Sequence, residues 1–122
     1  SKKKKKSATG DLLNSIDIIE HSYNEMWHAI YTEMMEENLM MGKIDTVFCY
    51  VKEIGYSEIS FLKITKKLYI EKILNDIYIN LLDVQYFVIS WNLRLVSGEQ
   101  VLLESHTVFP LLPPTPPPPL PP

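Results

Sequence analysis

Apolar residues recur at spacings of three and four between Asp11 and Met41. This spacing places them on one face of an α-helix, and Asp11 is a suitable residue for the helix N-cap. The apolar face would consist of Leu12, Ile16, Ile19, Tyr23, Met26, Trp27, Ile30 and Met34. The pattern therefore predicts a first amphipathic helix over residues 11–41.

Two further segments have a similar spacing. Residues 45–54 would place apolar side chains on one side of a helix that ends at Gly55, although their β-branched and aromatic content also suits a strand. We predict a helix for this segment. Ser57 is a suitable cap for a third helix that runs to about Leu82, with an inner face formed by Phe61, Ile64, Leu68, Ile73, Ile77 and Leu81.

Beyond the third helix the hydrophobic period changes to two, which is typical of β-strands. Two strands joined by a three-residue loop, with Gly98 in a left-handed conformation, would form a hairpin. This loop would place Leu95 opposite Val101 and Leu93 opposite Leu103, so that both pairs share one face of the hairpin. The predicted fold is therefore α+β, with about three helices and a C-terminal β-hairpin in a single globular domain, residues 11–108.

A basic arm, residues 1–10, precedes this domain and contains the five consecutive lysines Lys2–Lys6. Such a run can act as a nuclear-import signal or contact RNA or anionic lipid, and it can equally be a solubilising arm. The rest of the chain has seven basic and fifteen acidic residues, a net charge of −8. A surface this acidic disfavours binding to the phosphates of nucleic acid.

The last fourteen residues, 109–122, contain all nine prolines of the chain. Each proline removes a backbone donor and holds φ near −65°, so we expect a polyproline II tail outside the domain, roughly 40 Å long when straight. Aromatic-lined grooves bind such segments because little conformational entropy is lost on binding. We therefore predict an interaction or adaptor protein that uses this tail as a ligand.

Parts of the tail resemble known ligands of proline-binding domains. Phe109-Pro110-Leu111-Leu112-Pro113 resembles the ligands of EVH1 domains, and Pro118-Pro119-Leu120-Pro121 resembles those of one WW-domain class. Residues 116–120 are similar to the tracts that profilin accepts. No Arg or Lys flanks the prolines to pair with the acidic pocket of an SH3 domain. The predicted partner-binding residues are Phe109, Pro110, Leu112, Pro113, Pro118, Pro119, Leu120 and Pro121.

An alternative function depends on residues 45–82, where the order helix, Gly55, helix, hairpin is also that of a winged helix-turn-helix. The stretch Gly55-Tyr-Ser-Glu-Ile-Ser60 resembles the second helix-turn-helix of AraC-type regulators, and the resemblance ends after some fourteen residues. It implies that Ser60, Lys63 and Lys67 would face the major groove of DNA. Arginine, the commonest reader of guanine, does not occur in this segment.

The sequence contains no evident catalytic constellation, and we predict a protein that is not an enzyme and binds no metal or cofactor. Glu25 and His28 form one Glu-x-x-His half-site, but a dimetal bundle needs a second such pair, which does not occur. Cys49 is the only cysteine, which excludes an internal disulfide, and its apolar neighbours indicate a small buried residue.

Four methionines, Met34, Met35, Met40 and Met41, lie near the end of the first helix. They would fill the core or form an interface, so a homo-oligomer through this Met-rich helix is a further expectation. No secretory signal is visible, and charged residues interrupt the most apolar stretch, residues 68–96. We therefore expect an intracellular protein, cytoplasmic or nuclear.

Overall fold

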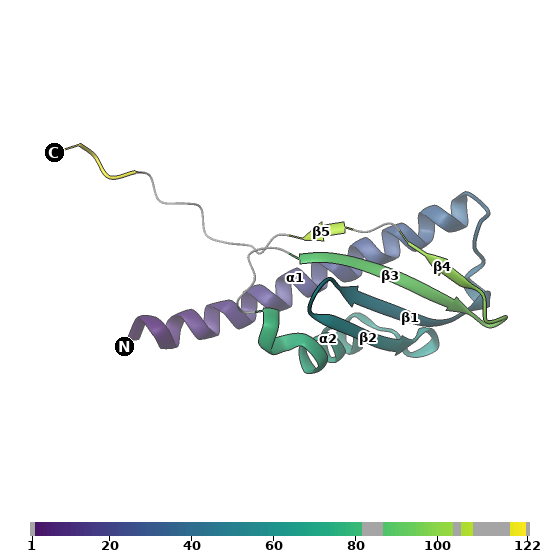
Figure 1. Cartoon of the computed structure of the whole chain (residues 1–122), viewed down its shortest axis with the longest axis horizontal. Coiled ribbons are helices and arrows are strands. Elements are labelled where there is room, and N and C mark those ends of the chain that lie inside the picture. Colours follow the sequence, from purple (N-terminus) through teal and green to yellow (C-terminus); the bar gives the residue numbers. More distant parts are fainter. Residues whose placement is uncertain (1, 82–86, 104–105, 109–117, 122) are drawn as a thin grey trace.

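The computed structural model describes residues 2–81, 87–103, 106–108 and 118–121 of the 122-residue chain. These residues form an α+β fold in which two α-helices pack against an antiparallel sheet (Figure 1). In chain order the elements are α1 (Lys2–Met35), η1 (Met41–Lys43), β1 (Ile44–Val51), β2 (Gly55–Ser60), η2 (Phe61–Lys63), α2 (Lys66–Leu81), β3 (Phe87–Leu95), β4 (Gln100–Leu102) and β5 (His106–Val108).

The first predicted helix is confirmed, with different ends. Helix α1 begins at Lys2 rather than Asp11, and it ends at Met35, before Glu37 adopts a φ of 62°. The predicted apolar face is buried or partly buried wherever its side chains are described. The division of the chain into a basic arm, a domain and a tail stays a prediction, although α1 includes the lysine run.

The predicted helix over residues 45–54 is wrong, because this segment is strand β1. Its side chains alternate, with Val47, Cys49 and Val51 buried and with Tyr50 exposed on the other side. Strand β1 pairs with β2 along one edge and with β3 along the other. Pairing along both edges satisfies the backbone groups of the segment, which its helix-like spacing of apolar residues does not reveal.

The third predicted helix is also shorter than expected. Helix α2 begins at Lys66, after Thr65, whose Oγ1 accepts a hydrogen bond from the Leu68 backbone N–H (3.1 Å). Ser57, the expected cap, lies in β2 with its hydroxyl donating to Asp76 Oδ2 (2.8 Å). Residues 55–60 are therefore a strand rather than a helix.

This hairpin also contradicts the winged helix-turn-helix arrangement of residues 45–82. That arrangement needs a helix on each side of a turn at Gly55, whereas Gly55 begins β2 directly after β1. The turn between these strands contains Glu53, whose φ is 66°. The helix-turn-helix prediction is therefore wrong as a description of the fold.

The C-terminal hairpin is confirmed, with a loop of the expected length and a shifted register. Leu93 pairs with Val101, and the Leu95 N–H donates to the Glu99 carbonyl (2.7 Å). The three-residue loop is therefore 96–98 rather than 97–99. Gly98 has a φ of +92°, as its predicted role requires. Because the register moves by two residues, the predicted apolar face still points to the core.

The sheet has the strand order β2-β1-β3-β4. Strand β5 also pairs with β3, at residues 87–89, whereas β4 pairs with residues 92–94 of the same strand. Both helices lie against one face of this sheet (Figure 1). The core between the two layers contains Ile19, Met26 and Ile30 of α1, and Val47, Ile59, Trp91 and Leu93 of the strands. No helix within the described part of the chain is long and apolar enough to cross a membrane.

Candidate functional site

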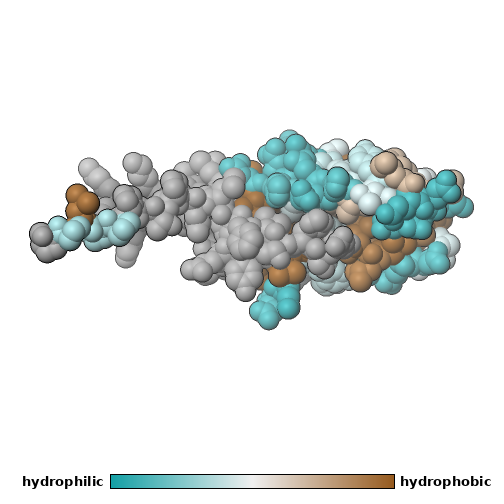
Figure 2. Space-filling view, turned by 90° about the horizontal axis from the view of Figure 1, so that it is seen from above, coloured by the Kyte–Doolittle hydropathy of each residue, from teal (hydrophilic) through white to brown (hydrophobic). Residues whose placement is uncertain are grey.

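The predicted tail ligand is described only at its far end. Pro118, Pro119, Leu120 and Pro121 are exposed and belong to no helix or strand, and the Leu120 side chain is 90% exposed. Figure 1 shows this segment away from the sheet, and in Figure 2 it lies at one end of the molecule. The other predicted partner-binding residues, Phe109, Pro110, Leu112 and Pro113, lie outside the described residues.

The tail begins after β5, and the strand register shows where. Val108, the last residue of β5, pairs with Phe87, the first residue of β3. Tyr50 of β1 pairs with Ser90, only three residues further along β3. At roughly 3.3 Å per residue along a strand, the origin of the tail lies about 10 Å along the sheet from the row that contains Tyr50.

That row belongs to the face of the sheet opposite the helices, which we call the open face. Its described side chains include three cross-strand rows: Tyr56–Tyr50–Ser90, Glu58–Phe48–Asn92–Leu102 and Ser60–Thr46–Arg94–Gln100. Exposed residues in every row indicate that water reaches this face. The open face therefore offers a flat surface beside the start of the tail.

Three aromatic side chains gather on the open face. The ring centroids of Tyr50 and Tyr56 are 5.5 Å apart, and each lies 6.4 Å from the centroid of Phe48. Tyr50 is 38% exposed and Tyr56 is 56% exposed. We refer to Phe48, Tyr50 and Tyr56 as the aromatic cluster. The sequence analysis missed it because β1 was expected to be a helix; the alternation of residues 47–51 is the signal that indicates it.

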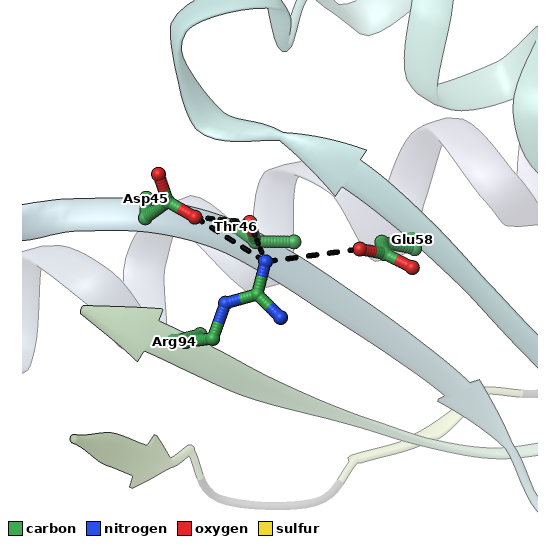
Figure 3. A network of polar contacts seen from close by, with 4 residues as sticks. All are labelled: Asp45, Thr46, Glu58 and Arg94. Atoms are coloured by element: carbon green, nitrogen blue, oxygen red, sulfur yellow. Dashed lines mark hydrogen bonds and ion pairs between the residues drawn. The ribbon is translucent and has the colours of Figure 1, made fainter. Parts of the chain in front are cut away.

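Arg94 lies against one ring of this cluster, and Figure 3 shows its side chain between Asp45, Thr46 and Glu58. Its guanidinium carbon lies 5.4 Å from the centroid of the Phe48 ring, a distance typical of a cation–π contact. Its Nη2 donates to Thr46 Oγ1 (3.0 Å) and lies 3.4 Å from Asp45 Oδ2 and 3.8 Å from Glu58 Oε1. The guanidinium is thus paired within the domain, between two carboxylates and a ring.

Asp45 reaches this network because it is the extra residue of a bulge. Ile44 pairs with Leu95 and Thr46 with the next residue, Arg94, so that Asp45 has no partner of its own on β3. The Thr46 hydroxyl donates to Asp45 Oδ2 (2.7 Å). This hydrogen bond, followed by those from Arg94, lowers the pKa of the Asp45 carboxyl below its usual value.

A second polar network lies in the core, centred on the hydroxyl of Tyr69. The Ser22 hydroxyl donates to the Ile19 carbonyl (2.7 Å), so its oxygen accepts the phenol proton across 3.0 Å. Trp91 Nε1–H donates to the phenol oxygen (3.1 Å), and the Cys49 thiol is the remaining donor (3.3 Å). This core network links α1, β1, α2 and β3 through one side chain.

All four side chains of the core network are buried, so their hydrogen bonds stabilise the packing of the two helices against the sheet. Burial raises the pKa of the Cys49 thiol to about 12, so the thiol stays neutral at physiological pH. Burial also raises the pKa of Tyr69. The expectation that Cys49 is a small buried residue is confirmed.

The remaining candidate residues lie on separate elements. Ser60 ends β2, Lys63 lies in η2 and Lys67 lies in the first turn of α2; all three are exposed. His21 Nε2 lies 3.9 Å from Glu25 Oε1 on the exposed side of α1. Within the described ranges, no group of three His, Cys, Asp or Glu side chains could hold a metal ion.

The methionine cluster lies at the end of α1 and in the connection to β1. Met35 and Met40 are exposed, whereas Met34 packs partly against the core. A homo-oligomer formed through this helix stays a prediction.

Comparisons with protein-family models, with curated proteins and with solved structures found no match, so the function has to be inferred from this chain alone.

Proposed function

We propose that this protein is a non-enzymatic intracellular interaction or adaptor protein that presents its proline-rich tail to EVH1, WW or profilin-type partners. The observation that carries the proposal is the exposure of Pro118–Pro121 away from the domain. An aromatic groove has to surround a polyproline segment on at least one side, so a ligand buried against its own domain could not bind.

The chemistry of the tail supports partners of this kind. Its nine prolines have no backbone N–H, so the tail offers carbonyl acceptors and apolar rings to a groove that supplies aromatic side chains and donors. The tail has no charged side chain. Binding should therefore depend little on salt, in contrast to binding of a charged peptide.

A labelled peptide of residues 109–122, titrated against one EVH1 domain, one WW domain and profilin, tests the proposal by fluorescence polarisation. We expect saturable binding below about 1 mM to at least one of them. The same titration with the full chain checks that the domain leaves the tail accessible. The absence of saturable binding to all three would contradict the proposal.

Two single variants distinguish the partner classes. Phe109→Ala removes the aromatic residue that an EVH1 groove needs and leaves the WW-like segment intact. Leu120→Ala removes the leucine of the WW-like segment and leaves the EVH1-like segment intact. Each variant therefore serves as the control for the other: a true EVH1 ligand should lose binding only with the first, and a true WW ligand only with the second.

A further inference from the structure

The aromatic cluster is the exposed feature of the fold that the proposed function does not use. Phe48, Tyr50 and Tyr56 form a contiguous ring surface on the open face, on strands β1 and β2, and the tail begins at β5 on the other side of β3. Stacked tyrosines that point into water contribute little to the core. A contiguous patch of exposed rings is typical of a binding surface.

The geometry of the cluster suits a polyproline II ligand. Its ring centroids are separated by 5.5–6.4 Å. A polyproline II helix has three residues per turn, so residues that share one edge of it are separated by about 9 Å along the axis. One turn of such a ligand is therefore long enough to cover the whole cluster, with its pyrrolidine rings against the aromatic rings. The phenol groups of Tyr50 and Tyr56 would supply the O–H donors that proline carbonyls require.

The charges around the cluster also favour a neutral ligand. Arg94 is already paired with Asp45 and Glu58, so it offers no free positive charge to an acidic partner. The chain without its lysine run has a net charge of −8, which repels acidic ligands in general. The tail of this protein is uncharged and apolar, and it meets both conditions.

The same molecule's tail is poorly placed to bind its own cluster. Strand β5 ends opposite Phe87 and pairs with β3, on the other side of β3 from β1 and β2, which carry the cluster. Pro118–Pro121 stands away from the domain (Figure 1). Nine prolines in fourteen residues favour an extended conformation, which disfavours a turn back over the open face.

We propose that the aromatic cluster binds the proline tail of a second copy of this chain. The tail begins about 10 Å along the strands from the row of Tyr50 and about 10 Å across the sheet from β1, so two copies related by a two-fold axis near this end can exchange tails reciprocally. Each cluster then binds the tail of the other copy, and the result is a closed dimer. Because the tail is also the ligand of the proposed function, self-association and partner binding compete for it.

Sedimentation equilibrium of the full chain over a range of concentrations tests this proposal. We expect a reversible dimer whose dissociation constant rises at least about tenfold in the double variant Tyr50→Ala/Tyr56→Ala, because two stacked rings are lost. The matched control is Tyr31→Ala, which removes an equally exposed tyrosine from α1 on the helical side of the sheet. The control should leave the dimer unchanged.

Two further measurements identify the occupant and the contact. Excess free peptide of residues 109–122 should convert the dimer to monomers. The double variant Tyr50→Phe/Tyr56→Phe, which keeps the rings and removes the donors, should weaken the dimer less than the alanine variant. A chain that is monomeric at all concentrations, or a dimer that the peptide and the tyrosine variants leave intact, would overturn the proposal.

An interface through the exposed methionines at the end of α1 is the alternative that the same assay distinguishes. If Met35→Gln/Met40→Gln dissociates the dimer and the tyrosine variants do not, the interface is the Met-rich end of α1 and the tail exchange is refuted. These outcomes are independent of the proposed function. Binding of the tail peptide to an EVH1, WW or profilin partner is measured without this domain and can succeed or fail by itself.

Discussion

Replacing Tyr69 by phenylalanine tests how much the core network stabilises the fold. The substitution removes one oxygen atom and leaves the buried ring in place. The edge-to-face contact of this ring with Tyr23, at 5.2 Å between centroids, is therefore retained. Any loss of stability then reports on the phenol group rather than on ring packing.

The magnitude follows from the contacts that the phenol oxygen makes. It takes part in two hydrogen bonds of ordinary length, with Ser22 (3.0 Å) and Trp91 (3.1 Å), and in a weaker contact with Cys49 (3.3 Å). A buried hydrogen bond contributes about 0.5–1.5 kcal/mol to stability, and a buried polar group that loses its partner costs about 1–3 kcal/mol. We expect Tyr69→Phe to lower the free energy of unfolding by about 2–4 kcal/mol.

Urea denaturation followed by far-UV circular dichroism measures this change. For a domain of about 100 residues, the expected loss corresponds to a decrease in Tm of roughly 10–20 °C. Tyr31→Phe is the control, because that tyrosine is 48% exposed and its hydroxyl should contribute less than about 0.5 kcal/mol. Equal effects of the two substitutions, or a loss below about 0.5 kcal/mol for Tyr69→Phe, would refute the role assigned to the network.

Three other predictions concern the thiol, the β3–β4 loop and the Asp45 carboxyl. Burial raises the pKa of Cys49 to about 12, so a thiol reagent at pH 8 should react only as fast as the chain unfolds; stability should fall as the pH rises above 9 towards 12, because only the unfolded thiol ionises there. Immediate labelling of the folded chain would contradict this. Gly98→Ala should destabilise the fold by about 1 kcal/mol through its φ of +92° alone, since no atom lies within 4 Å of the added Cβ; an unchanged urea midpoint would contradict this. Thr46→Val and Arg94→Gln should each raise the pKa of Asp45, measured by carboxyl NMR titration, because the threonine hydroxyl and the guanidinium both lower it; an unchanged pKa in either variant would contradict the geometry of the network.

The sequence predicted the parts of the fold that depend on local pattern. The spacing of apolar residues in α1 and the alternation on either side of Gly98 are visible within a single element. The β1 segment was misassigned because its apolar positions fit both a helix and a strand. Its pairing with β3, for example Cys49 with Trp91, joins residues 42 positions apart, and nothing local to β1 indicates this partner.

In the candidate site, too, features that depend on local sequence differ from those that depend on contacts between distant residues. The tail ligand stays a prediction, which depends on the composition of residues 109–122 and the polyproline II preference that this composition confers. The aromatic cluster could not be predicted, because Tyr50 and Tyr56 become neighbours only through the turn between β1 and β2. The hydroxyl network around Tyr69 was missed for the same reason, since its members come from four separate elements.

The most direct test of whether the domain leaves the tail accessible is a comparison of two affinities for a proline-binding partner. One is the affinity of the full chain, and the other is that of the free tail peptide. At concentrations low enough to keep the chain monomeric, the two dissociation constants should agree within about twofold, because the domain leaves the tail free. At higher concentrations the full chain should bind more weakly as tails are exchanged between copies. A dilute chain that binds tenfold more weakly than the peptide, or a peptide that binds no partner at all, would contradict the account.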